Sequence, residues 1–380
     1  MIHQKLCLDV KSWMYFVQVE HKNYLYQFCL DLETDLRWSI QETSTSQKTL
    51  DSFYLTSLVH EVLAHLHHLN DVCDVTVERR SILSEIKSRL RSSMTLDNTA
   101  NEGHPPIVLH GEQGVGKTCV MARLHSKISH WFGSDCVRVT RFVGITHNSS
   151  HVFDLVLSLA QQIAHAYSIT LPRDLQLKSM SKLASIFLKL LRRVSAQPQT
   201  RCQPLFILLD NLDALSSLYN AHNPTWLPSV LPEHVYVIIS VTQSSDVMYS
   251  RLKAHIKSAE SFVPLQGFSV TSASSYVDLF VTSRQRRVTA EQRQTILNMA
   301  RGAENSPLYM WLILSQAVYW DASFAPSELA LGKTASAAAE CIVTKLMTTH
   351  GRTVTSFTLA YITIAQGCPL IITHCVHYRT

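Results

Sequence analysis

The sequence lacks the features of secreted and of repeat proteins. Its nine cysteines among 380 residues are scattered, and no two of them form a Cys-x-x-Cys pair. This pattern is typical of reduced thiols, so we expect a cytoplasmic protein. The N-terminal residues include Lys5 and Asp9 and no uninterrupted apolar run, which argues against a secretory signal. No internal repeat of solenoid or propeller length is present.

Long apolar runs and a strong charge of one sign are also missing. The apolar stretch Phe357 to Val376 is interrupted by Gln366, Gly367 and Pro369, so we expect no membrane insertion. The 34 basic and 29 acidic residues leave a net charge of only +5. Short basic groups such as Arg192 and Arg193 are most simply solvated helix faces, and we expect no nucleic-acid partner.

Histidines gather on one predicted helix, Ser52 to Leu69, but not at the spacing of a zinc site. A zinc-protease helix needs histidines four residues apart, whereas His60 and His65 are five apart. Their side chains therefore point in different directions. We expect solvated or partly buried histidines there and no metal ion.

The chain does contain a glycine-rich turn that ends in lysine and threonine. The apolar stretch Ile107 to Leu109 leads into this turn, and helical spacing follows it. Such a turn points backbone N–H groups at phosphate oxygens, and the helix N-terminus adds partial positive charge. Lys117 would reach the β and γ phosphates, and the Thr118 hydroxyl would ligate magnesium. We therefore expect ATP or ADP with Mg²⁺, bound by Gly111, Glu112, Gln113, Gly114, Val115, Gly116, Lys117, Thr118 and Cys119.

Apolar strands alternate with helices around this turn. Near-continuous apolar strands separated by helices indicate a parallel sheet covered on both faces, hence an α/β nucleotide-binding core. The predicted strands are Ile107 to Leu109, Cys136 to Val143, Leu205 to Leu209, Val235 to Val241 and Phe262 to Leu265. The predicted helices begin at Lys117 and span Val152 to Ala166 and Leu175 to Val194.

Polar side chains follow two of these strands at the edge where ligands bind in open α/β sheets. Asp210 ends the apolar strand from Leu205, and we expect it to hold magnesium beside Thr118. Asp213, one turn further, is the candidate to orient an attacking water. Thr242 ends the next strand, where its hydroxyl could sense the γ phosphate, with Gln243 as the alternative.

After Gly267 the pattern becomes purely helical. Ser269 can cap one helix, and Thr289 with Gln292 forms a capping box for a second. Pro307, preceded by Ser306, can begin a third helix. The stretch Pro326 to Gly367 indicates further helices.

From about Val75 to about Gly367 the chain resembles the NACHT class of signal-transduction ATPases, in particular the NACHT and WD-repeat proteins and their nephrocystin-like relatives. The resemblance implies a P-loop NTPase sheet of the ASCE/STAND type. It also implies that Pro307 touches the nucleotide from a helical lid and that Val77 to Arg80 lies near the base. The motifs that carry it, besides the phosphate loop, are Leu205-Phe-Ile-Leu-Leu-Asp-Asn-Leu-Asp213, Leu231-Pro232-Glu-His-Val235, Leu265-Gln-Gly-Phe-Ser269 and Asn305-Ser-Pro-Leu308.

The resemblance also implies a domain order. We expect an N-terminal helical region at residues 1–74, a linker helix at 75–105, the NTPase domain at 106–266, a helical lid at 267–330 and a partial winged helix at 331–380. Within the linker, the helix Arg80 to Arg91 is followed by the polar segment Ser92 to Pro106. The tail Cys368 to Thr380 fits no continuation of the family, so we expect a truncated or alternatively spliced product that lacks C-terminal repeats.

Two departures from the family bear on chemistry. Ala214 stands where a second acid is common, and Thr242 and Gln243 stand where an arginine is common. Without these groups, charge in the transition state lacks a stabiliser, so we expect hydrolysis to be slow or absent.

We therefore expect an ATP/ADP-dependent switch with protein partners on its helical regions and nucleotide-dependent self-association. Two alternatives stay open. A P-loop kinase would need an arginine-rich lid, for which Arg284, Arg286 and Arg287 are the candidates. An interaction scaffold would need no nucleotide.

Overall fold

The computed structural model describes residues 50–73, 77, 79–96, 103–172, 175, 179–243, 247–321 and 332–364. The chain divides into two compact units, residues 1–57 and 58–380. In the first unit the described part is the start of helix α3 (Leu50–Cys73), which continues into the second. All features below belong to residues 58–380.

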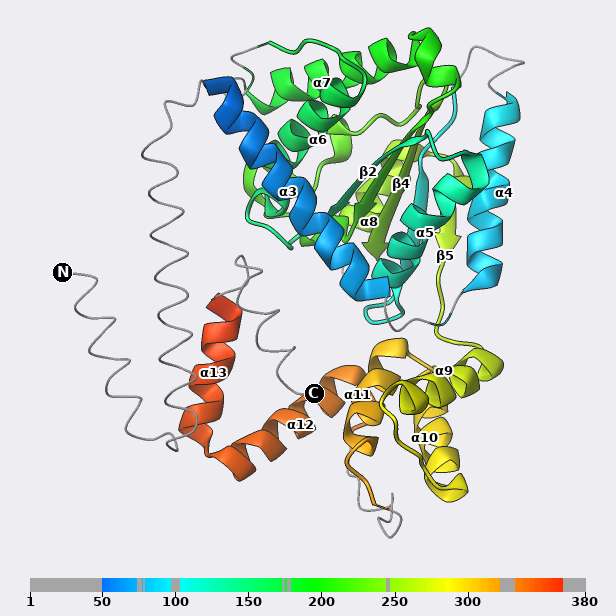
Figure 1. The fold of residues 1–380 in the computed structure, drawn as a ribbon, viewed down its shortest axis with the longest axis vertical. Coiled ribbons are helices and arrows are strands. Elements are labelled where there is room, and N and C mark those ends of the chain that lie inside the picture. The colour runs from blue at the N-terminus through cyan, green and yellow to red at the C-terminus, as the bar shows by residue number, and fades with distance from the viewer. Residues whose placement is uncertain are drawn as a thin grey trace, which may run out of the picture. The chain divides into compact units, whose positions relative to one another are not determined.

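Five parallel strands form one sheet in the order β2-β3-β4-β1-β5 (Figure 1). Every residue of β3 and β4 is buried, as expected for central strands covered on both faces. Their side chains alternate between two apolar cores: Leu205, Ile207 and Leu209 enter one core, and Phe206 and Leu208 enter the other. The strands are β1 (Ile107–Gly111), β2 (Val137–Phe142), β3 (Leu205–Asp210), β4 (Val235–Thr242) and β5 (Phe262–Pro264).

Helices cover both faces of this sheet, which confirms the predicted P-loop NTPase architecture of the α/β class. One core contains residues of α6 (Val152–Ala166), α7 (Met180–Ser195) and α8 (Val247–Ile256). The other contains residues of α4 (Arg80–Leu96) and α5 (Lys117–Phe132). The parallel strands end at a common edge, so the turn after β1 and the acid at the end of β3 emerge together.

The predicted helices need three corrections. Helix α7 begins at Met180 rather than Leu175. Helix α8 was not predicted, because it is short and its first turn carries no acidic residue. Helix α4 continues to Leu96, so the first part of the predicted polar linker is helical. The hydroxyls of Ser92 and Ser93 donate to carbonyls one turn earlier, which satisfies them within the helix.

The helices after β5 form a third apolar core of their own. They are α9 (Val270–Ser283), α10 (Ala290–Gly302) and α11 (Pro307–Ala317). Their predicted starts are confirmed: the Ser269 side chain accepts from Ser272 N, and Thr289 forms a full capping box with Gln292. Pro307 occupies the first turn of α11, where its missing N–H costs nothing.

Two more helices end the described part of the chain, α12 (Ala335–His350) and α13 (Arg352–Ile364). The tail Cys368 to Thr380 lies outside the described residues, so the partial winged helix stays a prediction. Among the helices that the structure describes, none is long and apolar enough to span a bilayer.

A partly buried histidine between α5 and β2 makes folding stability depend on pH. His125 Nδ1 lies 2.8 Å from Thr140 Oγ1, and burial, with nearby Arg138, lowers its pKa to about 4. Because the unfolded chain takes up a proton first, stability falls as pH falls below about 6.5. This histidine accounts for about 2 kcal/mol of the loss between pH 7 and pH 5.

We expect His125→Asn, which cannot be protonated, to flatten the pH dependence of unfolding free energy measured by urea denaturation. His130→Asn is the matched control, because His130 is exposed on the same helix. Equal pH dependence in the two variants would contradict this interpretation.

Candidate functional site

The turn between β1 and α5 has the backbone of a phosphate-binding loop. Gly114 and Gly116 adopt positive φ angles of 83° and 92°, which favour glycine. Gly111 is required for a different reason: a Cβ there would lie 2.3 Å from the carbonyl oxygen of Leu265. The backbone therefore curls tightly at the C-terminal edge of β1, directly before the α5 N-terminus.

Lys117 lies buried under this loop. Its ammonium donates to the carbonyl oxygens of Gly111, at 2.9 Å, and Glu112, at 3.0 Å. Burial lowers its pKa, while Asp213, Asp210 and Glu112 oppose the shift. The cation is thus held at the loop by weak carbonyl acceptors, which phosphate oxygens can replace with stronger charge-assisted bonds.

Thr118 and Asp210 meet as predicted for a magnesium pair. The Thr118 hydroxyl donates to Asp210 Oδ2 at 2.8 Å, and Ser240 donates to Oδ1 at 2.5 Å. Burial raises the pKa of Asp210, which these two hydrogen bonds and Lys117 oppose. Hydroxyl and carboxylate oxygens are hard ligands of the kind Mg²⁺ prefers, so the two residues fit that ion together with nucleotide phosphates. The described residues contain no cluster of three or more His, Cys, Asp or Glu side chains that would hold a metal without a nucleotide.

The two predicted catalytic residues also contact each other. Asp213 Oδ1 accepts from the backbone N–H of Thr242 at 3.1 Å. Thr242 pairs with Gly111 in the β1–β4 register. Thr242 and Asp213 therefore both lie beside the phosphate loop. Gln243, the alternative sensor, donates its backbone N–H to Gly111 O, and its side-chain oxygen lies 3.1 Å from His110 Nδ1.

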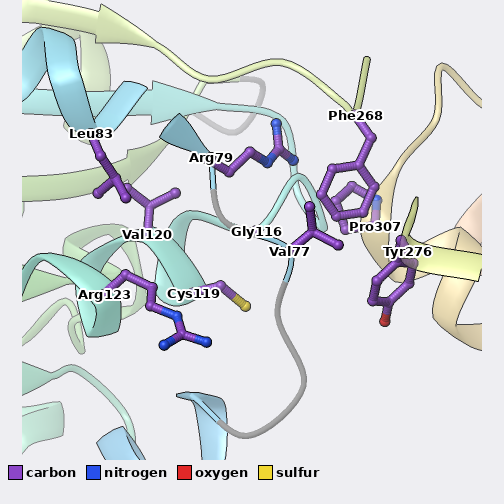
Figure 2. Close-up of a pocket in the computed structure, with 10 residues that line it drawn as sticks. All are labelled: Val77, Arg79, Leu83, Gly116, Cys119, Val120, Arg123, Phe268, Tyr276 and Pro307. Atoms are coloured by element: carbon purple, nitrogen blue, oxygen red, sulfur yellow. The ribbon is translucent and has the colours of Figure 1, made fainter. Parts of the chain in front are cut away.

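A largely apolar pocket opens beside Gly116. In Figure 2, Cys119 and Arg123 line it from α5, while Phe268, Tyr276 and Pro307 line it from the helical segment after β5. Cys119 and Pro307, both predicted nucleotide contacts, thus lie at the same pocket. Its place next to the phosphate loop and its apolar lining suit the base and ribose of a nucleotide. Val77, Arg79, Leu83, Gly116 and Val120 complete the lining.

Arg79 ties three segments together at this pocket. Its guanidinium donates to the carbonyl oxygens of Gln266, Gly267 and Val115, at 2.6, 3.1 and 2.7 Å. It also lies 4.4 Å from the ring centre of Phe268. Burial lowers its pKa to about 10, so it stays charged at neutral pH. One side chain therefore holds together the segment before α4, the phosphate loop and the segment after β5.

The first turn of α11 touches the phosphate loop directly. Leu308 donates its backbone N–H to Gly114 O at 3.1 Å, and the Ser306 hydroxyl lies 3.4 Å from the same oxygen. A Cβ on Gly114 would lie 2.8 Å from Leu308 Cβ. Helix α11 and the phosphate loop are thus in direct contact.

Sequence reasoning missed several residues of this site. Ser240 lies inside a buried strand, and only the strand order shows that it faces Asp210. Arg123 and Tyr276 belong to apolar helix patterns with no motif. Leu308 belongs to the motif Asn305-Ser-Pro-Leu308, but its contact with Gly114 depends on how the helices after β5 pack against the loop.

The chain is similar in sequence to proteins with ATPase and NACHT domains. Residues 88–234 match the AAA ATPase domain family. The chain is 27% identical over 305 residues to NACHT domain- and WD repeat-containing protein 1 of Mus musculus, which covers 80% of this chain and 19% of the relative. NACHT and WD repeat domain-containing protein 2 of Homo sapiens is 27% identical over 267 residues, covering 69% and 15%. The chain thus spans at most about a fifth of these relatives.

Among solved structures, Cdc6p from Pyrobaculum aerophilum aligns with a TM-score of 0.40 and 15% identity over 64% of this chain and 61% of that chain. The fold is assigned from the strand order of the sheet and the helices on its two faces.

We expect Arg79→Lys to lower the free energy of unfolding by about 1–3 kcal/mol, because an ammonium cannot reach three carbonyls in the planar fork of a guanidinium. Urea denaturation measures the loss. Arg91→Lys, at an exposed position on α4, is the control. A loss no larger than that of the control would show that the three bonds contribute nothing.

Proposed function

We propose that this P-loop NTPase, a relative of the NACHT and WD repeat-containing proteins, is a switch whose conformation depends on whether ATP or ADP is bound. The observation that carries the proposal is the hydrogen bond from Leu308 in the lid to Gly114 in the phosphate loop. A ligand that changes this loop must change its contact with the lid. Differential contact of this kind is what shifts a population between two conformations.

In this proposal each residue of the site has a defined task. Lys117 and the loop amides bind the phosphates, while Thr118 and Asp210 hold magnesium, which would neutralise phosphate charge when bound. Asp213 orients a water molecule, and Thr242 contacts the region of the γ phosphate. Pro307 and Cys119 flank the base and ribose.

Hydrolysis is slow in this proposal. Thr242 and Gln243 follow β4 with neutral side chains, and Ala214 supplies no second acid beside Asp213. The developing charge on a transferred phosphoryl group would be met by Lys117, the loop amides and magnesium, without an arginine after β4. A long-lived ATP state suits a switch better than a rapid cycle does.

We further propose that the switch acts in the cytoplasm on protein partners bound at its helical regions. Cys136 and Cys202 carry thiols rather than disulfides, in keeping with a reducing compartment. Nucleotide-dependent self-association would be one output of a lid that changes position.

We expect Lys117→Ala to abolish measurable binding of Mg²⁺–ATP in isothermal titration calorimetry, because the loop then loses its one buried ammonium. Lys182→Ala, exposed on α7, should bind as the wild type does. Undiminished affinity in Lys117→Ala would refute the assigned site. A wild-type chain whose melting temperature ignores ATP would instead favour a scaffold, since a ligand of the native state must stabilise it.

We expect Asp210→Asn to weaken the binding of magnesium while leaving the binding of metal-free nucleotide intact. Affinity for ADP in EDTA should stay near that of the wild type, while the gain on adding Mg²⁺ should fall by about 10-fold, because a neutral amide is a poor magnesium ligand. Asp135→Asn, in the exposed turn before β2, is the control. An unchanged magnesium gain would remove Asp210 from the metal site.

A further inference from the structure

Helix α3 docks on the sheet domain through a buried polar pair as well as apolar contacts. Leu69, in its C-terminal part, joins a small apolar cluster with Ala122 and Phe142. Earlier in the helix the inward residues are Glu61 and His65, which are 6% and 1% exposed. Polar groups are costly to bury unless every one of them is bonded, and bonded pairs fix position more narrowly than apolar contacts do.

His65 completes the hydrogen bonding of an edge strand. Its Nδ1 accepts the backbone N–H of Phe142 in β2 at 3.1 Å, and its Nε2 lies 3.0 Å from Glu61 Oε1. Accepting at Nδ1 requires a free lone pair there, so the hydrogen is on Nε2 and is donated to Glu61. The imidazole is therefore neutral and oriented by both neighbours.

Glu61 in turn holds the loop that follows β2, residues 143–151. The Thr146 hydroxyl donates to Glu61 Oε1 at 2.7 Å. Thr146 also organises the loop, because its backbone oxygen accepts from the hydroxyls of Ser149 and Ser150 at 3.1 and 2.9 Å. One carboxylate oxygen of α3 thus fixes both the histidine and the loop.

This loop is hydrogen-bonded to the segment that carries the acids of the nucleotide site. Ser150 O accepts the backbone N–H of Ser216 at 2.8 Å, at the end of residues 211–216 that contain Asp213. Val143 donates its N–H to Asp210 O at 3.0 Å. Hydrogen bonds therefore link α3 and this loop to the backbone of Asp210 and to the segment that contains Asp213.

The charges around the pair stabilise this arrangement. Burial lowers the pKa of His65, and Arg141 adds to the shift, which keeps the ring neutral. Burial alone would raise the pKa of Glu61, but hydrogen bonds from His65 and Thr146 outweigh it, and Arg141 adds attraction. His68, on α3, and Asp154, on α6, also face this cluster. Glu61 is thus ionised at neutral pH.

We propose that Glu61 and His65 are positioning residues for the magnesium side of the nucleotide site, and that docking of α3 sets the geometry of Asp210 and Asp213. This inference rests on the proposed nucleotide function of that site. Through these contacts, helix α3 can affect magnesium binding. Undocking of α3 frees residues 143–151 and then residues 211–216. It thereby weakens magnesium binding without changing the phosphate loop.

The test uses the full chain and breaks the route at two places. Glu61→Ala removes the acceptor on α3, and Thr146→Val removes the hydroxyl on the loop while keeping its shape. Glu61→Gln keeps an oxygen acceptor, and His67→Ala changes an exposed histidine on the same helix. His67→Ala should behave as the wild type does, and Glu61→Gln, which keeps the acceptor oxygen but not the charge, should lie closer to the wild type than Glu61→Ala does.

The first measurement is amide hydrogen exchange of the protein without nucleotide. Glu61→Ala and Thr146→Val should both speed exchange in residues 211–216 by about 10-fold relative to His67→Ala. Faster exchange confined to α3 and residues 143–151 would overturn the proposal. This measurement holds even if the chain binds no nucleotide, an outcome that would defeat the proposed function separately.

The second measurement is the ratio of ADP affinities with Mg²⁺ and with EDTA. Both breaking variants should lower this ratio by about 5- to 10-fold, with the EDTA affinity unchanged. A merely structural loss would lower both affinities together. Equal ratios in the two variants and in His67→Ala would overturn the proposal.

Discussion

The site depends on one constraint: the turn after β1 and the acid at the end of β3 must emerge at the same edge of the sheet. The 2.8 Å hydrogen bond between Thr118 and Asp210 expresses this constraint. Because β4 lies between β1 and β3, its end supplies Ser240 to the same carboxylate and Thr242 to Asp213. The carboxyl ends of these parallel strands therefore place the loop, the acid and the two hydroxyls at one edge of the sheet.

The same edge also explains where glycine is required. Gly111 lets the backbone pass Leu265, and a Cβ on Gly267 would lie less than 2.5 Å from the carbonyl oxygen of Glu304. Both glycines lie where the sheet domain meets the helices after β5. A side chain at either position would therefore force the sheet domain and the helices after β5 apart.

Sequence patterns predicted most of the fold because its signals are local. A few neighbouring residues are enough to indicate each of the five apolar strands. The same holds for the caps at Ser269 and Thr289 and for the start of α11 at Pro307. The phosphate loop and Asp210 were predictable for the same reason, since each follows an apolar strand directly. Contacts between distant segments were not predictable: Arg79 reaches residues 36 and 188 positions away, and Ser240 faces Asp210 from another strand.

The histidine-rich helix illustrates the same limit. His60 and His65 are five residues apart, not the four that would indicate a metal site. The buried pair is instead Glu61 and His65, an acid and a histidine whose partners lie in β2 and in the loop after it. An i, i+4 pair of that kind also occurs on solvated helices, so only the fold shows that this one is buried.

Apolar contacts hold each part of the molecule together, and polar contacts connect the parts to one another. Apolar cores fill the two faces of the sheet and, separately, the lid helices. The connections between these bodies use hydrogen-bonded polar side chains: Arg79 joins the helices after β5 to the phosphate loop, and Glu61 with His65 joins α3 to the loop after β2. Polar groups are costly to bury unless their hydrogen-bond partners stay in place. Losing one partner therefore weakens the whole connection while the apolar cores persist, which is the physical basis on which the proposed switch depends.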